Sequence, residues 1–190
     1  MQRTIYQTPV LRQIMRFLCW IGLKLAGWKL QGKPPSEPKY VLIAVPHTTN
    51  WDFPITLAMA FVLDFEIYWM GKDSLFKGMA GPVMRWLGGI PIDRSKNNNV
   101  VDQMILQFKT HEHLVVTVPP EGTRSEVDKW KTGFYHIAYG AGVPIAQGFL
   151  DYKRKVGGFG PTFYPTGDIE KDIAEIQAFY KGISGKRSGK

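Results

Sequence analysis

The stretch "YVLIAVPHTTNWD", residues 40–52, joins an unbroken apolar run to a cluster of polar side chains. Six consecutive apolar residues without alternation are typical of a strand that is buried on both faces of a parallel sheet. Pro46 ends the run, and residues 48–50 (Thr-Thr-Asn) have the composition of a turn. In open α/β sheets, ligands bind beyond the carboxyl ends of the strands. His47 and Asp52 are therefore the first candidates for a functional site.

The rest of the chain alternates between short apolar runs and amphipathic patterns of helical spacing. This alternation predicts an α/β fold: a single layered domain with a central, largely parallel sheet flanked by helices, plus an N-terminal amphipathic helix. The glycine-rich "VGGFGP", residues 156–161, is interpreted as a turn before a last short strand. We expect strands at 40–45, 66–70, 89–93, 114–118 and 144–150, and helices near 54–64, 74–87, 98–109, 131–141 and 168–181.

The net charge of +8 lies at the two ends of the sequence. Residues 1–40 hold seven Lys or Arg against one Glu, and residues 181–190 hold four cations and no acid, whereas the body between them holds 13 basic and 15 acidic residues. Nucleic-acid-binding proteins usually spread their basic side chains over one face of the body, so we expect no nucleic-acid partner and favour an anionic membrane surface. The single Cys19 excludes an internal disulfide framework.

The basic N-terminal part, "VLRQIMRFLCWIGLKLAGWKL" (residues 10–30), has apolar residues at helical spacing with cations between them. Its longest stretch without charge, residues 17–23, has seven residues, whereas a membrane-spanning helix needs roughly 20. Trp20 and Trp28 beside cations suit a helix that lies in the membrane interface. We expect a peripheral or monotopic protein at the cytoplasmic face, with the helix in residues 1–32, the catalytic domain in 33–182 and a flexible basic tail in 183–190. The alternative is a helix that packs on its own domain.

Three polar clusters follow predicted strands: "PHTTNWD", "DRS" (residues 93–95) and "PPEGTRS" (residues 119–125). In the first, helical geometry would not bring His47 and Asp52 together, because positions five apart on a helix point about 140° from each other. A turn would. If they meet, Asp52 fixes the tautomer of the imidazole and leaves the other ring nitrogen as a general base. The alternative is an ordinary loop histidine and a helix-capping aspartate.

The cluster "PPEGTRS" has the composition of an anion-binding loop. Gly122 allows a tight turn whose amides can face an anion, and the guanidinium of Arg124 suits phosphate or carboxylate. Glu121 could orient Arg124, and Arg94 is a second cation at the same edge of the sheet. The alternative is a salt bridge between Glu121 and Arg124 that merely holds the loop.

The sequence contains no evident protein nucleophile that His47 could activate, and no evident metal site. It contains no G-x-S-x-G motif, and none of its six serines stands in a nucleophile context. Cys19 lies within the N-terminal helix, and His111 and His113 lack a third convergent ligand. We therefore expect the base to activate a hydroxyl of a bound substrate, which attacks a second substrate without a covalent enzyme intermediate.

At this point four motifs, in order over residues 40–150, resemble the glycerophospholipid acyltransferases, the family of 1-acylglycerol-3-phosphate acyltransferase. "HTTNWD" is similar to the first block, H-x4-D; "GGIPIDR" looks like the second, "PEGTRS" the third and "GVPIAQG" the fourth. The resemblance implies transfer of an acyl chain from acyl-CoA or acyl-carrier protein to a hydroxyl of a lipid, with no metal or other cofactor. This sequence differs from the family pattern at Pro119, where the family usually has an aromatic residue. Asn50 and Trp51 also make its first block bulkier than usual.

By position, the resemblance makes His47 the general base and Asp52 its orienting carboxylate. It implies an acceptor-binding role for the third block, residues 121–124, and for the basic residue of the second; Val143 and Pro144 of the fourth block belong to the acyl-donor side. The acceptor-binding residues implied are Arg94, Glu121, Gly122, Thr123 and Arg124. The identity of the acceptor, the length of the acyl chain and the donor stay open.

Two other functions compete with acyl transfer. The same base could activate water and hydrolyse an acyl thioester. A non-catalytic protein that binds anionic membranes or nucleic acid through its basic ends is the second rival, although both members of the acid–base pair are present here.

Overall fold

The chain forms one seven-stranded sheet in a computed structural model that describes residues 3–92, 99–125, 127 and 129–187. The strand order is β1–β7–β6–β2–β5–β3–β4, and every neighbouring pair is parallel except β6 and β7. This confirms the α/β fold with a largely parallel sheet. The strands are β1 (Lys29–Gln31), β2 (Lys39–Val45), β3 (Tyr68–Lys72), β4 (Gly89–Ile92), β5 (Leu114–Val118), β6 (Ile145–Asp151) and β7 (Val156–Phe163).

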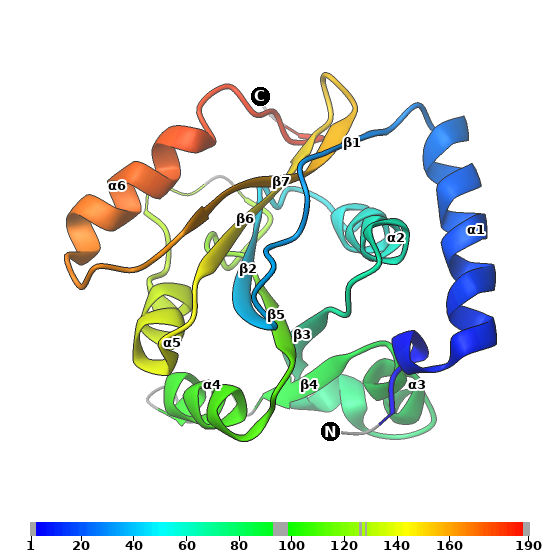
Figure 1. Cartoon of the computed structure of the whole chain (residues 1–190), viewed down its shortest axis with the longest axis horizontal. Helices are drawn as coiled ribbons and strands as arrows, with labels where there is room; N and C mark the ends of the chain where they lie inside the picture. The colour runs from blue at the N-terminus through cyan, green and yellow to red at the C-terminus, as the bar shows by residue number, and fades with distance from the viewer. Residues whose placement is uncertain (1–2, 93–98, 126, 128, 188–190) are drawn as a thin grey trace.

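Helices cover both faces of the sheet (Figure 1). On one face lie α4 (Asn99–Thr110), α5 (Gly133–Ala141) and α6 (Ile169–Phe179). On the other lies α2 (Asp52–Leu63), with the N-terminal helix α1 (Pro9–Leu25) packed outside it. The short α3 (Ala80–Trp86) and the 3-10 turns η1 (Ile5–Gln7) and η2 (Asp73–Phe76) complete the described elements.

The central strand β2 supplies both halves of the core because its side chains alternate between the two faces. Val41, Ile43 and Val45 pack with α4, α5 and α6, whereas Tyr40 and Leu42 face the side of α2. All five are buried. The apolar run therefore forms the doubly buried strand that its composition predicts.

Strand register brings three chain segments to one edge of the sheet. Val45, at the end of β2, pairs with Phe149 of β6, and Ile43 pairs with Val118 at the end of β5. All three strands run in the same direction, so the segments that follow them emerge side by side. The polar clusters after β2 and β5 are thus neighbours in space.

Two sequence predictions are wrong about local structure. The helix expected over 74–87 is split into η2 and α3, because Gly78 between them adopts a left-handed φ of 67°. The turn expected at 156–161 is part of β7, and the chain reverses at residues 152–155 instead. The glycines of this strand serve close packing: a Cβ on Gly158 would lie 2.0 Å from the Gln31 carbonyl oxygen of β1.

The sequence also missed β1 and placed β3 two residues too early. Strand β1 has only three residues and pairs in parallel with β7. It ties the end of α1 to the edge of the sheet. The expected division of the chain into residues 1–32, 33–182 and 183–190 stays a prediction.

Candidate active site

The turn after β2 brings His47 and Asp52 together. Pro46 follows a cis peptide bond, and the chain then turns into α2, whose first residue is Asp52. His47 Nδ1 lies 3.2 Å from Asp52 Oδ2. The imidazole is partly exposed, at 25% of its side-chain surface, whereas the carboxylate is buried. The pair has a shielded acid and an accessible ring, as a base and its orienting group require.

Donors on every side hold the Asp52 carboxylate in place. Oδ2 accepts hydrogen bonds from the backbone amides of Thr48 and Thr49, at 2.7 and 2.8 Å. Oδ1 accepts from the Thr49 hydroxyl at 3.0 Å and from the Tyr152 hydroxyl at 2.6 Å. Burial alone would raise the pKa of Asp52, but the hydrogen bonds from His47, Tyr152 and Thr49 outweigh it and lower the pKa to about 2. The Asp52 carboxyl is therefore ionised throughout the physiological pH range.

Glu121 supports His47 from the neighbouring loop. Its carboxylate accepts a hydrogen bond of 2.6 Å from the backbone amide of His47. Burial raises the pKa of Glu121, although that hydrogen bond opposes the shift. The guanidinium of Arg124 instead donates to the side-chain oxygen of Asn50. The salt bridge between Glu121 and Arg124 considered from the sequence is absent from the contacts of the described residues.

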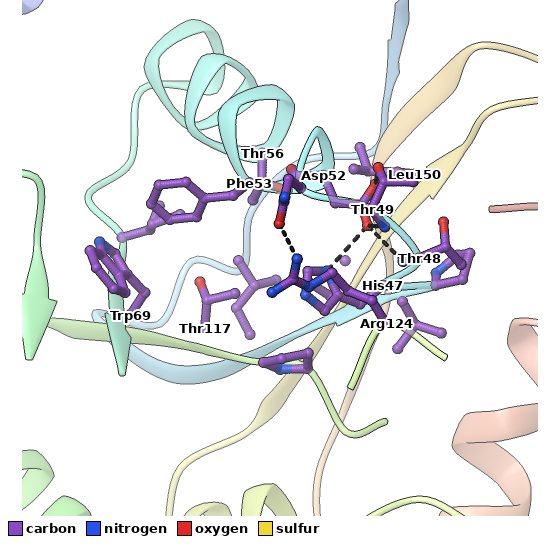
Figure 2. A pocket seen from close by; sticks show the side chains of 18 of the residues that line it. His47, Thr48, Thr49, Asp52, Phe53, Thr56, Trp69, Thr117, Arg124 and Leu150 are labelled. Carbon is purple, nitrogen blue, oxygen red and sulfur yellow. Dashed lines mark hydrogen bonds and ion pairs between the residues drawn. The ribbon is translucent and has the colours of Figure 1, made fainter. Parts of the chain in front are cut away.

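A large cavity begins at this pair. Its volume is about 1060 Å³. Polar side chains from the turn after β2 and from the β5–α5 loop line its mouth, where Figure 2 shows Arg124 reaching toward the His47–Asp52 turn. Its inner part lies between the sheet and α2 and is lined by apolar side chains: Leu42, Met59, Leu63, Phe65, Ile67, Leu150 and Phe159. The cavity can hold a polar group next to His47 and an apolar chain beyond it.

The structure brings most of the predicted site residues to the mouth of the cavity. Gly122, Thr123 and Arg124 line it, and Gly122 has a left-handed φ of 65°. Arg94 lies outside the described residues. Val143 and Pro144 do not line the cavity. They precede β6 and therefore lie at the opposite edge of the sheet, where Val143 packs into the core and the carbonyl of Pro144 accepts a hydrogen bond from Val41.

Three residues of the site were not predicted from the sequence. Thr49 and Tyr152 bind the Asp52 carboxylate, and Arg187 lines the mouth of the cavity. Tyr152 directly follows β6, so the rule that sites form at strand ends could have found it. Nothing in the sequence near Arg187 indicates its position. Within the part of the chain that the structure describes, no cluster of three His, Cys, Asp or Glu is placed to hold a metal.

The N-terminal helix has two apolar faces rather than one. Leu11, Met15 and Leu23 pack toward α2, whereas Phe17 and Leu18 face solvent with 60% and 54% of their surfaces exposed. Arg12 and Arg16, expected beside a membrane, form ion pairs with Asp64 at the end of α2. Lys24 stacks over Trp20. Among the described helices, none has the length and apolar character to cross a bilayer.

Comparison with known proteins identifies relatives of this fold and site. The family model described as Acyltransferase matches residues 29–146. The chain is 28% identical over 138 residues to a 1-acyl-sn-glycerol-3-phosphate acyltransferase of Haemophilus influenzae; the match covers 66% of this chain and 56% of that protein. The chain thus spans little more than half the length of this relative.

The fold also has a counterpart among solved structures. The crystal structure of PlsC, the 1-acyl-sn-glycerophosphate (LPA) acyltransferase from Thermotoga maritima, matches with a TM-score of 0.64 at 14% identity. The match covers 94% of this chain and 81% of that one. At 14% sequence identity, this match shows that the two folds are alike and nothing more.

Proposed function

This chain belongs to the acyltransferase family, and on that basis we propose that it transfers an acyl chain from acyl-CoA or acyl-carrier protein to a lysophospholipid such as 1-acylglycerol-3-phosphate. The match over most of the chain confirms the resemblance that the four motifs indicate. The acceptor, the donor and the role of each residue are our proposal.

The observation that carries the proposal is the His47–Asp52 pair at the mouth of a cavity with an apolar interior. Because Asp52 occupies Nδ1 of the imidazole, Nε2 is the nitrogen that faces a substrate. It takes the proton of the acceptor hydroxyl as the hydroxyl oxygen attacks the thioester carbonyl. The new C–O bond forms, the C–S bond breaks, and the imidazolium returns its proton to the leaving thiolate. No covalent enzyme intermediate is needed.

The two ends of the cavity match the two ends of the substrates. Arg124 at the mouth is the proposed ligand for the acceptor phosphate, because a guanidinium binds phosphate through two parallel hydrogen bonds. The apolar part between the sheet and α2 is the proposed site of an acyl chain, because it removes the chain from water. An extended apolar interior supports a lipid substrate over a small polar one.

Peripheral association with the cytoplasmic face of a membrane is the second part of the proposal. The outer face of α1 exposes large apolar side chains along its length, and tryptophan and lysine flank them: Val10, Ile14, Phe17, Leu18, Trp20, Lys24 and Leu25. A helix of this composition binds with its apolar face at the boundary of head groups and acyl chains. Such a position would place the cavity close to its lipid substrates.

The test follows both products of the reaction. Purified protein and its His47→Ala variant are incubated with palmitoyl-CoA, or with palmitoyl-carrier protein, and a panel of lysophospholipids. Free thiol is measured together with lipid products by mass spectrometry. We expect a new diacyl lipid that disappears in the variant.

Other products would favour the rival functions. Thiol release that yields only free fatty acid would identify a thioester hydrolase. If neither donor gives any product with the parent protein, the proposed transfer is wrong and a membrane-binding function without catalysis gains support.

A further inference from the structure

Residues 184–187 pass along the mouth of the cavity; we call them the rim segment. In Figure 1 the C-terminal part of the chain runs from α6 to the reversal between β6 and β7. The carbonyl of Ser184 accepts a hydrogen bond of 2.9 Å from the amide of Tyr152, the residue that also binds Asp52. The start of the tail that was expected to be flexible thus has defined contacts.

Further contacts join the rim segment to the catalytic turn. The amide of Lys186 donates a hydrogen bond of 3.0 Å to the Thr48 hydroxyl, and the Lys186 ammonium lies 5.0 Å from the centre of the Trp51 ring. Gly185 is buried, and a Cβ there would lie 2.5 Å from the Thr48 methyl carbon. A larger residue at this position would therefore require the Thr48 side chain to move. The rim segment is packed against the residues between His47 and Asp52.

This anchoring places a second guanidinium at the mouth. Arg187 lines the cavity, as do Arg124 and Lys72, whereas Asp52 is the single carboxylate in the lining that the structure describes. Asp52 is buried, and its carboxylate already contacts the His47 ring and accepts hydrogen bonds from the hydroxyls of Tyr152 and Thr49. Among the described residues, neither Arg187 nor Arg124 forms an ion pair. In the described part of the chain, the mouth is therefore electropositive, and its two arginines have no anionic partner of their own.

We propose that Arg187 binds a phosphate group of a substrate at the mouth of the cavity, and that the rim segment is part of the substrate-binding site. The inference rests on the proposed function, because it assigns a further ligand to that site. A phosphate that lies between two guanidiniums gains hydrogen bonds from both, which neither arginine provides alone. The phosphate can come from the acceptor head group or from the nucleotide part of acyl-CoA.

The test pairs each phosphate-bearing substrate with a phosphate-free counterpart. The acceptors are 1-octanoylglycerol-3-phosphate and 1-octanoylglycerol; the donors are octanoyl-CoA and the octanoyl thioester of N-acetylcysteamine. Arg187→Ala is compared with the parent, with Arg187→Lys and with Lys181→Ala, which removes an exposed cation that does not line the cavity. We expect Arg187→Ala to raise KM about tenfold for a single phosphate-bearing substrate and to change kcat less than about twofold.

The pattern of KM values identifies the phosphate. A rise confined to the phosphorylated acceptor assigns Arg187 to the head group, and one confined to octanoyl-CoA assigns it to the donor. Arg187→Lys should lie between Arg187→Ala and the parent. An unchanged KM for both, or an equal rise for the phosphate-free counterparts, would overturn the proposal.

Direct binding separates this inference from the proposed function. Calorimetric titration of 1-octanoylglycerol-3-phosphate and octanoyl-CoA into the His47→Ala protein, with and without Arg187→Ala, requires no turnover. If the parent protein transfers no acyl chain but Arg187→Ala weakens binding of either ligand about tenfold, the proposed function fails and the phosphate site stands. Equal binding with and without Arg187 would overturn the site whatever the outcome for activity.

Discussion

Tyr152, 100 positions after Asp52 in the sequence, donates a hydrogen bond of 2.6 Å from its hydroxyl to the Asp52 carboxylate. The bond connects the end of β6 to the start of α2. The tyrosine ring is held in turn by an edge-to-face contact with Trp28, and its amide by the carbonyl of Ser184. The orientation of the Asp52 carboxylate thus depends on three segments that are distant in sequence.

Tyr152→Phe should lower kcat about three- to tenfold with little change in KM. The variant keeps the ring but removes one of the two donors to Asp52 Oδ1, and a hydrogen bond to a charged group contributes about 1.5–3 kcal/mol. Tyr164→Phe is the matched control, because Tyr164 also donates to a carboxylate, Glu37, at an exposed position outside the cavity lining. Equal kinetics for the two variants would exclude a positioning role for Tyr152.

Asp52→Asn should lower kcat by about 10²–10⁴ while the fold is retained. The amide cannot stabilise an imidazolium as a carboxylate does, and it disturbs the tautomer of His47. Steady-state kinetics with far-UV circular dichroism check the two halves of this prediction. Retention of the parental rate would remove Asp52 from the mechanism.

The same substitution should change the pH dependence of stability. The pKa of Asp52 is lowered from its ordinary value near 4 to about 2 in the folded protein. A lowered pKa stabilises the fold at pH values well above 4, and this stabilisation is lost as the pH falls toward 2. We expect the carboxylate to contribute about 2 kcal/mol to the free energy of unfolding at pH 7 and roughly half of that at pH 3. Urea unfolding of parent and Asp52→Asn at both pH values measures the difference.

Asp73, a half-exposed carboxylate that lies 2.8 Å from the exposed Lys77 ammonium, provides the control for that measurement. Asp73→Asn alters a residue of η2 outside the cavity lining, and we expect it to change the free energy of unfolding by less than about 0.5 kcal/mol at either pH. A difference between parent and Asp52→Asn that is the same at pH 7 and pH 3 would contradict the assigned shift in pKa.

Glu121→Gln should keep the rate within about threefold of the parent, whereas Glu121→Ala should lower kcat about tenfold or more. A glutamine oxygen can still accept the hydrogen bond from the His47 amide, but alanine leaves that donor without its partner. Steady-state kinetics on both variants separate hydrogen bonding from charge. If Glu121→Gln is as slow as Glu121→Ala, the negative charge is what matters.

Arg124→Ala should weaken use of the phosphorylated acceptor more than use of the donor. Its KM for the lysophospholipid should rise about tenfold or more, because the guanidinium is the proposed phosphate ligand. Its KM for the acyl donor should change less. Lys129→Ala is the control, since Lys129 belongs to the same connection between β5 and α5 but does not line the cavity. A selective effect on the donor would move Arg124 from the acceptor to the thioester side.

Replacing Phe17 and Leu18 together by glutamate should release the protein from vesicles of phosphatidylglycerol, because both side chains belong to the exposed face of α1. Leu106→Glu is a suitable control: Leu106 is 58% exposed, like the two targets, but lies on α4 at the opposite face of the sheet. Co-sedimentation measures the bound fraction. Equal release of both proteins would mean that α1 has no particular affinity for the membrane.

The sequence predicted those features that depend on local pattern. The run at residues 40–45 is short, apolar throughout and followed by proline and turn residues, which favours a strand buried on both faces of the sheet. The motif after it then indicated His47 and Asp52, since parallel strands direct their ends to one edge. The composition of the loop after the strand at 114–118 indicated Glu121 and Arg124 as an anion-binding site, and the family resemblance implied the same role.

Features that depend on contacts between distant segments escaped prediction. Glycines 157 and 158 were predicted to form a turn. Instead, their lack of a side chain lets β7 pack closely against β1 and α2. The role of Tyr152 requires knowledge of where β6 ends relative to α2. Val143 and Pro144 carry a family motif, but the direction of β6 takes them to the far edge of the sheet.

One helix carries both the chemistry and the shape of the cavity. Asp52, Thr56, Met59 and Leu63 lie on successive turns of α2 and all line the cavity. The rise of a helix separates the first from the last by about 16 Å. If the apolar part of the cavity holds the acyl chain, as we propose, a substitution at Leu63 would change the accepted chain length without disturbing the carboxylate at Asp52. On this proposal, the far end of a single helix could change which lipid is made while the reaction centre at its first residue stays the same.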